Sequence, residues 1–306
     1  MDKKLWTKPI CSTCILEVAT KTIQLATSNE KLQFKAVKKV LQILSEEFSE
    51  NAMPVWISNK IFQEISKITR NPDPFKKLKE ESNKIALKVA EKIRRHIHEG
   101  KTFNEKLRRA LIAAVTGNII DFGTAKHKFN LKQLENIYFE VLHQGFSIDD
   151  SNHLQKMLEA NPKILYIGDN AGEIVFDKLL IELLIKKGIK ITYVVKDKPI
   201  SNDATLEDAQ QVKLTKLIKV ITTGSSSLGV NFNNVSKEFL EEFNKSTFII
   251  AKGQSNYECF TWFKNKIKKP VFLILRAKCN PLAEHIGTNI GKNVLRLIQP
   301  KKIHAK

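Results

Sequence analysis

Residues 164–177 read ILYIGDNAGEIVFD, and this stretch decides the fold. It begins with an apolar run typical of a buried strand, breaks at Gly168, and continues into an amphipathic segment with helical spacing. Asp169 and Asn170 stand at the break, and Glu173 stands at the start of the helical segment. The pattern therefore predicts a strand, a turn and a helix, with an acid, an amide and a second acid at the end of the strand.

Four more apolar, β-branched runs follow at intervals of about 25 to 30 residues. They are KITYVVK (190–196), LIKVITTG (217–224), STFIIAKG (246–253) and PVFLILRAK (270–278). Each interval is long enough for a crossover helix, so the strands should be parallel and the sheet doubly wound. Residues 156–306 are therefore predicted to form a Rossmann-like α/β domain with a mainly parallel sheet and helices on both faces.

The N-terminal half has a different pattern. Apolar residues recur at three- and four-residue spacing from Cys11 to Phe146, for example in FKAVKKVLQILSEEF (34–48) and NKIALKVAEKIRRHI (83–97). We expect residues 1–155 to form an all-helical domain that packs directly on the sheet domain. The fold class is thus α/β with a helical N-terminal part.

Composition limits the kind of protein. The chain of 306 residues is 42% hydrophobic and 27% charged, which suits a globular protein with a substantial core. No uncharged apolar run approaches the ~18 residues of a membrane span, and the start, MDKKLWTKPICSTC, lacks the apolar segment of a secretory signal. The four cysteines have no framework spacing. We expect a cytoplasmic protein with reduced thiols and no membrane partner.

The net charge of +19 raises the alternative of a non-catalytic nucleotide- or nucleic-acid-binding α/β protein. The distribution of the charge argues against a nucleic-acid partner. Lysines are scattered among glutamates, and only FKNKIKKP (263–270) and QPKKIHAK (299–306) are dense clusters, without interleaved aromatic residues. A dinucleotide is also disfavoured, because GDNAGE lacks the GxGxxG spacing and has acids where a pyrophosphate would lie. The excess of lysine would suit a small phosphorylated substrate.

In open α/β sheets, ligands bind at the carboxyl ends of the strands, so the residues after each strand are the candidate site. They are Gly168, Asp169 and Asn170 after the first strand, Asn202, Asp203 and Thr205 after the second, Lys252, Gly253 and Asn256 after the fourth, and Lys278 after the fifth. Acids and amides come from the first two strands and lysines from the last two.

These groups predict phosphoryl chemistry. Asp169, Asn170 and Asp203 form an all-oxygen set that suits a hard divalent ion such as Mg²⁺ or Mn²⁺. Lys252 and Lys278 would hold a phosphate while water attacks phosphorus. The alternative for each residue is structural: the acids and the amide would cap the following helices, and the lysines would be exposed. Because polar residues follow every strand at the same edge of the sheet, we favour a catalytic site over the structural alternative. The sequence does not decide whether Asp169 or Glu173 is the general base.

Several of these blocks resemble a known family. YIGDNAGEIVFD, PISNDATLEDA, AKGQSNYE and LRAKCNPLAEHIG are similar, in order, to the signature blocks of the damage-control phosphatases, also catalogued as domain of unknown function eighty-nine. CSTC and GNIID (117–121) are similar to the marks of its CxxC/GNxID subgroup, found in archaea and bacteria. The resemblance spans nearly the whole chain.

The resemblance implies a metal-dependent phosphatase (Mg, Mn, Co or Ni) that hydrolyses phosphate monoesters of sugars or damaged metabolites by metal-activated water. By position, the metal ligands of the family fall on Asp169, Asn170 and Asp203. The substrate loop falls on residues 254–258, which include Gln254 and Asn256 and follow Lys252 and Gly253. The phosphate-binding lysine falls on Lys278. One departure concerns the substrate. Some sugar-phosphate-active relatives carry an arginine where this chain has Glu258, so their preference does not transfer.

Six further residues could surround the ligands: Glu173, Asn202, Asn118, Asp121, Cys11 and Cys14. Asn118 and Asp121 either close a hydrogen-bond network at a helix end or line the substrate wall. The two cysteines are one helical turn apart, and they either pack an N-terminal helix or have a metal or redox role. The seven histidines show no ligand spacing and are expected in the surface or the core. The sequence leaves the oligomeric state open.

Overall fold

Strand β2 (Lys163–Ile167) lies inside a seven-stranded sheet of order β1-β7-β6-β5-β2-β3-β4, in a computed structural model that describes residues 6–119 and 131–300. The other strands are β1 (Ile148–Asp149), β3 (Lys190–Val195), β4 (Lys219–Thr222), β5 (Phe248–Lys252), β6 (Val271–Arg276) and β7 (Asn293–Ile298). All neighbouring pairs are parallel except β6 and β7. The predicted α/β class with a mainly parallel sheet is confirmed.

Two strands were not predicted. Strand β7 runs antiparallel to β6, with Val271 opposite Ile298, and the two-residue β1 pairs with β7. The connection from β6 to β7 contains only the seven-residue helix α12 (Asn280–Ile286), and it is not a crossover because β7 runs back beside β6. Antiparallel strands need no such crossover, and a search based on crossover spacing therefore missed it.

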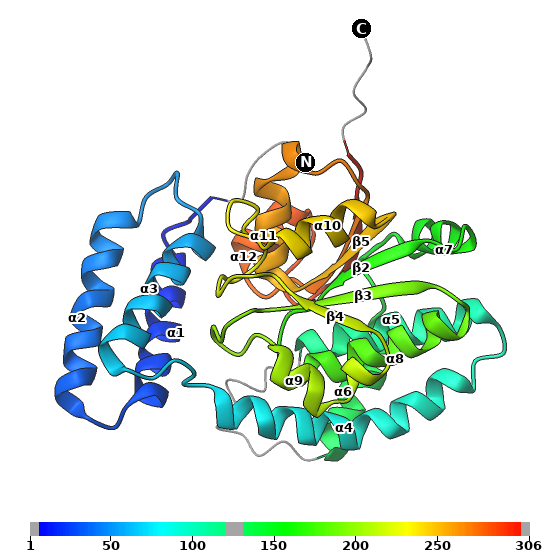
Figure 1. Ribbon diagram of the computed structural model, residues 1–306, viewed down its shortest axis with the longest axis horizontal. Helices are drawn as coiled ribbons and strands as arrows, with labels where there is room; N and C mark the ends of the chain where they lie inside the picture. Colours follow the sequence, from blue (N-terminus) through cyan, green and yellow to red (C-terminus); the bar gives the residue numbers. More distant parts are fainter. Residues whose placement is uncertain (1–5, 120–130, 301–306) are drawn as a thin grey trace, which may run out of the picture.

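Both faces of the sheet are covered, and the alternation of side chains along β2 shows how. Ile164 and Tyr166 pack into the core on the face of α5 (Phe103–Ile119) and α8 (Glu173–Lys186), while Leu165 and Ile167 pack with α10 (Lys237–Lys245), α11 (Gly253–Trp262) and α12 on the other. Figure 1 shows these two helical layers, with α4 (Lys76–His98), α6 (Leu131–Gln144) and α9 (Leu206–Gln211) on the α8 face.

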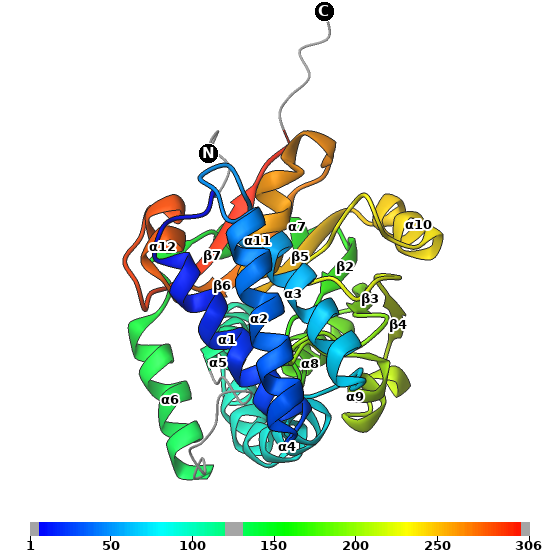
Figure 2. The ribbon, with the colours of Figure 1, turned by 90° about the vertical axis from the view of Figure 1, so that its left-hand side faces the viewer.

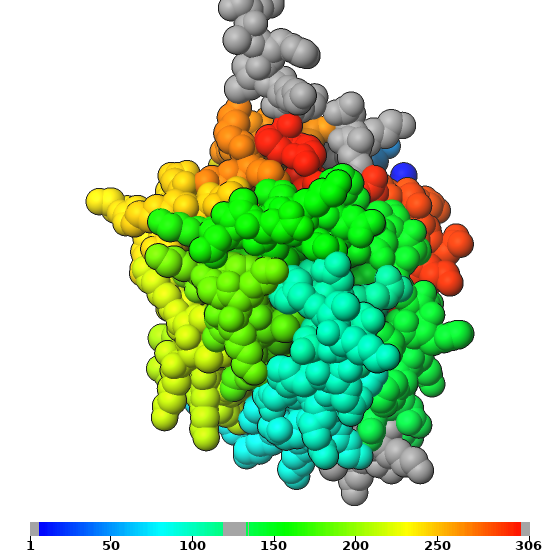
Figure 3. All heavy atoms as spheres, turned by 90° about the vertical axis from the view of Figure 1, so that its right-hand side faces the viewer, coloured from blue at the N-terminus to red at the C-terminus, as the bar shows by residue number. Residues whose placement is uncertain are grey.

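The side of the molecule shown in Figure 3 is built mainly from the middle of the chain, coloured cyan to yellow. Helix α7 (Ser151–Glu159) precedes β2 there, and Leu154 and Leu158 anchor it in the same core as α5 and α8. The amino ends of the parallel strands are thus enclosed by local packing.

The first three helices form a separate layer. Helices α1 (Cys11–Ala26), α2 (Glu30–Glu47) and α3 (Pro54–Thr69) share their own apolar core, which includes Ile23 and Ile61. Figures 1 and 2 show this bundle standing at one end of the sheet domain. By contrast, α4 and α5 share a core with the sheet strands. The predicted boundary at residues 155 and 156 stays a prediction.

Several contacts join the N-terminal segment and the bundle to the sheet domain. Val55, at the start of α3, packs with the buried Cys259 of α11, and the side-chain oxygen of Asn59 accepts a hydrogen bond of 2.7 Å from the backbone of Leu228. Trp6 stacks edge-on against Trp262 with ring centroids 5.2 Å apart. Among the described helices, none combines the length and the apolar character needed to cross a bilayer.

The central strands should dominate stability. Ile250 of β5 is 0% exposed, so Ile250→Ala should lower the free energy of unfolding by about 2–5 kcal/mol in urea titrations. Leu41→Ala, at a residue that is 49% exposed, is the control and should change it by less than about 0.5 kcal/mol. Equal losses in the two variants would contradict the core described here.

Candidate active site

A cavity of about 480 Å³ lies between the bundle and the carboxyl ends of the strands. Its polar side is formed by residues that follow β2, β3, β5 and β6: Asp169, Asn170, Asn202, Asp203, Gln254 and Lys278. Its other side is mainly apolar and comes from the N-terminal segment and the bundle: Trp6, Ile10, Ile15, Val18, Val55 and Phe62. The cavity therefore joins two chemically different walls.

The loops after β2 and β3 are joined by backbone bonds. Asn170 and Asp203 form an isolated antiparallel bridge, and the N–H of Ala204 donates to the carbonyl oxygen of Asp169 at 2.8 Å. These bonds fix the two acids relative to each other. Asp169, Asn170 and Asp203, predicted from separate strand ends, line one cavity.

The capping alternative does not account for these residues. The N-cap position of α8 is Gly172, and that of α9 is Thr205, whose backbone N–H donates to the Asp208 carboxylate at 2.8 Å. Asp169 and Asp203 occupy neither cap. Their side chains face the cavity instead.

Asp169 is a buried acid among other acids. Asn118 and Asn170 both donate to its Oδ2, at 3.1 and 2.9 Å. Burial raises the pKa of Asp169 well above its usual range, and the negative charges of Glu173 and Asp203 raise it further. Ionised Asp169 therefore lacks sufficient positive charge around it, which is the situation that a bound cation would relieve.

Asp203 forms an ion pair with Lys196. Burial raises its pKa to about 6, while the ammonium of Lys196, 3.6 Å from Oδ2, acts in the opposite direction. Lys196 is itself buried and donates to the carbonyl of Gly229 at 2.6 Å. Within the described residues, Asp203 Oδ2 accepts no hydrogen bond. Lys196 was not among the predicted residues, although it directly follows β3 and strand-end reasoning could have found it.

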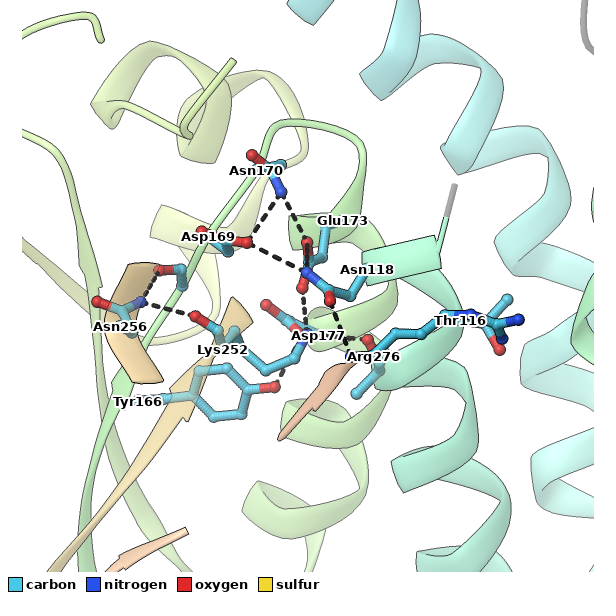
Figure 4. A network of polar contacts seen from close by, with 12 residues as sticks. Thr116, Asn118, Tyr166, Asp169, Asn170, Glu173, Asp177, Lys252, Asn256 and Arg276 are labelled. Carbon is cyan, nitrogen blue, oxygen red and sulfur yellow. Dashed lines mark hydrogen bonds and ion pairs between the residues drawn. The ribbon is translucent and has the colours of Figure 1, made fainter. Parts of the chain in front are cut away.

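A buried network supports Asp169 (Figure 4). Glu173 is 0% exposed, and its Oε2 accepts hydrogen bonds from Asn118 at 3.1 Å and Asn170 at 3.2 Å. Because the same two amides also bind Asp169, the orientation of Asp169 depends on Glu173. Asn118 accepts the backbone N–H of Arg276 as well, which connects α5 to the end of β6.

Lys252 is the cation of this network. Its ammonium donates to Glu173 Oε1 at 2.6 Å, to Asp177 Oδ1 at 2.6 Å and to a backbone carbonyl of α5 at 2.8 Å. Tyr166 and Tyr193 donate to Asp177 at 2.7 and 2.8 Å. Burial lowers the pKa of Lys252, but the two acids outweigh it and raise the pKa to about 12. The lysine is a fixed structural charge.

Comparison with known proteins agrees with the geometry. Residues 7–294 match a family model described as the damage-control phosphatase ARMT1-like domain. The chain belongs to this family.

Its relatives are similar over most of their length. An uncharacterized protein of Methanocaldococcus jannaschii is 42% identical over 94% of both chains. Proteins named damage-control phosphatase from Archaeoglobus fulgidus and Pyrococcus horikoshii are 30% and 36% identical, over 95% and 92% of this chain and 99% and 94% of theirs. The crystal structure of a DUF89 family protein from P. horikoshii has a TM-score of 0.83 at 35% identity, and the match covers 97% of this chain and 99% of that one.

The prediction that Lys252 binds phosphate conflicts with the structure of this family member. Lys252 is 0% exposed, does not line the cavity and has three partners inside the protein. Asn256 is also buried and donates to the carbonyls of Gly168 and Lys252, at 3.2 and 2.7 Å. Both residues position the loop after β5 and do not reach a ligand in the cavity.

Gly253 has a steric role. Its φ of +79° is one that side-chain-bearing residues rarely adopt, and a Cβ there would lie 1.9 Å from Asp169 Oδ2. Glycine therefore lets the start of α11 approach the acid closely. This residue was predicted to bind substrate, and in the structure it makes room for Asp169.

The remaining predicted residues divide into two groups. Asn202, Cys11 and Cys14 line the cavity, whereas Asp121 lies outside the described residues. Burial raises the pKa of Cys14, and the charges of Cys11, Glu17 and Glu258 raise it further, which keeps this thiol protonated. In the described part of the chain, no three His, Cys, Asp or Glu side chains are grouped to hold a metal, so the candidate ligand set needs the amide of Asn170.

Removing the buried cation should be costly. Lys252→Met leaves Glu173 and Asp177 as uncompensated charges and should lower the free energy of unfolding by about 3–5 kcal/mol, measured by urea titration. Lys67→Met is the control, because Lys67 is 70% exposed and its ion pair with Glu64 should contribute less than about 1 kcal/mol. If both variants lost the same small amount, the network would not hold the site together.

Proposed function

We propose that this protein is a metal-dependent phosphatase that hydrolyses phosphate monoesters of small metabolites. The observation that carries the proposal is the cavity in which two buried acids, Asp169 and Asp203, and the amide of Asn170 face the same space as Lys278. The names of two relatives, both damage-control phosphatases, support the reaction class. Cys11 and Cys14 fit the CxxC mark of the archaeal and bacterial subgroup.

The donor set fits a hard divalent cation such as Mg²⁺, Mn²⁺, Co²⁺ or Ni²⁺. Among the described residues, none donates a hydrogen bond to the buried Asp203 Oδ2, and the pKa of Asp169 is raised by burial and by the charges of Glu173 and Asp203. Asp169, Asn170 and Asp203 would hold the ion through oxygen. When bound, the ion supplies positive charge for phosphate oxygens and lowers the pKa of water for attack.

The phosphate group needs donors on the side away from the acids. Lys278 is exposed and lines the cavity, so its ammonium is available there as a donor to the phosphate. The first turn of α11, with Gln254 and Ser255 at the wall, adds backbone N–H groups that have no acceptor within their helix. Together they would bind and orient the phosphate.

Of the two acids considered as general base, Asp169 is the one that can act. Glu173 is 0% exposed, its Oε1 accepts from Lys252, and its Oε2 accepts from Asn118 and Asn170. It has no access to a water in the cavity. Asp169 lines the cavity, so of these two acids it is the one placed to accept the proton of the attacking water.

The alternative of a non-catalytic nucleotide- or nucleic-acid-binding protein depends on the net charge of +19 alone. It offers no reason for two acids to be buried beside one cavity. A phosphatase needs them there.

Activity is tested with protein stripped of metal and resupplied with Mg²⁺, Mn²⁺, Co²⁺ or Ni²⁺, against sugar phosphates, phosphorylated cofactors and nucleotides. Asp203→Ala should reduce turnover below detection and leave the circular dichroism spectrum unchanged, because the ligand set is lost. Asp197→Ala, at an exposed acid outside the cavity lining, should keep full activity. Undiminished turnover in Asp203→Ala would exclude Asp203 as a ligand.

The acids should also make the metal-free protein sensitive to pH. Because the pKa of Asp169 is raised on folding, its ionisation removes stability as the pH rises above its unfolded value of about 4. Asp169→Asn should therefore melt at a higher temperature than the metal-free wild type at pH 7, with the difference shrinking toward pH 4. Mn²⁺ should raise the melting temperature of the wild type only. A variant that Mn²⁺ stabilises equally would contradict the assignment.

A further inference from the structure

Glu258 is a buried acid in the cavity wall that the proposed chemistry does not use. It lies on α11 and is 4% exposed. Its Oε1 accepts a hydrogen bond from Gln254 Nε2 at 2.9 Å, one helical turn before it. Its Oε2 is buried and accepts no hydrogen bond from the described residues. One carboxylate oxygen is thus left for a group that the protein does not provide.

In the described part of the chain, no cation forms an ion pair with this acid. Burial raises the pKa of Glu258 to about 7, and only Gln254 and the nearby backbone N–H of Val55 act against it. No ion pair among residues 6–119 and 131–300 includes it. A buried carboxylate with an unpaired oxygen is unfavourable by several kcal/mol in general, and native structures rarely keep one without a functional reason.

Glu258 faces the part of the cavity next to the bundle. It lines the cavity together with Cys14 of α1 and Cys279 after β6. The wall around this region is mainly apolar, with Ile15 of α1 and Val55 of α3, and Ser58 of α3 adds a hydroxyl. The acids proposed to hold the metal lie instead at the tips of β2 and β3.

We propose that Glu258 binds an N–H donor, an ammonium or an amide, on the non-phosphate part of the substrate, and that the rest of this part is apolar. The inference rests on the proposed phosphatase function and names its substrate class. The free Oε2 supplies the acceptor, and the bundle supplies the apolar surface.

An N–H donor fits better than a set of sugar hydroxyls. A charge-assisted hydrogen bond from nitrogen to a buried carboxylate is about twice as strong as a neutral one, and it removes the uncompensated charge. Several hydroxyls would instead need several polar partners, and the bundle side of the cavity is mainly apolar, with Ser58 and the thiols of Cys11 and Cys14 among few polar groups there.

The test uses metal-loaded enzyme and ω-aminoalkyl phosphates of increasing chain length. Each is paired with an alkyl phosphate in which a methyl group replaces the ammonium. At the chain length that spans the cavity, the wild type should have a kcat/KM at least about tenfold higher for the amine, mainly through KM. Glu258→Gln should lose most of this preference, and Glu258→Leu should reverse it.

Glu241→Gln is the matched control, because Glu241 is an exposed acid on α10, and the preference should be retained. Melting curves check folding of the Glu258 variants. Removal of an uncompensated buried charge should not destabilise them, and the wild-type preference is informative without any variant. Equal kcat/KM for both members of every pair would overturn the role of Glu258 and leave the phosphatase standing. No hydrolysis of any phosphate with any of the four metals would overturn the proposed function itself.

Discussion

The buried ion network of Lys252, Glu173 and Asp177 is the constraint on which the rest of the site depends. Three charges at zero exposure are tolerable only when the geometry satisfies every donor and acceptor, and here each proton of Lys252 has a partner. The network joins the end of β5 to α8 and α5. Through the amides of Asn118 and Asn170 it also sets the position of Asp169. The same contacts therefore stabilise the fold and fix the geometry of the site.

The acids of the cavity, unlike those of the Lys252 network, are not fully neutralised or hydrogen-bonded. Asp169, Asp203 and Glu258 are buried acids whose pKa values are raised, and each lacks part of the positive charge or hydrogen bonding that would stabilise it. Natural proteins retain such groups where a ligand completes them. The satisfied network inside the sheet domain supplies the rigidity that holds these unsatisfied groups in place, and the two kinds of charge lie within one α/β unit.

Much of the site could be predicted from local sequence. Strand-end reasoning identified Asp169, Asn170, Asp203 and Lys278, and all four line the cavity. It failed for Lys252, because position at a strand end does not tell whether a side chain faces the ligand or the core. The partners that draw Lys252 inward, Glu173 and Asp177, are 79 and 75 residues away in the chain. The burial of Glu258 was equally invisible, because α11 and the bundle come together from distant parts of the sequence.

The sequence by itself determined the α/β class, the mainly parallel sheet and the polar strand ends, because hydrophobic periodicity and the spacing of strands are local properties of the chain. Only the tertiary structure decided which helices form the separate bundle and that β7 pairs with β6 in the antiparallel direction. It also decided that a mainly apolar wall faces the acids. Those outcomes depend on which buried surfaces and charges meet across long sequence separations, and periodicity within one segment carries no information about its partner.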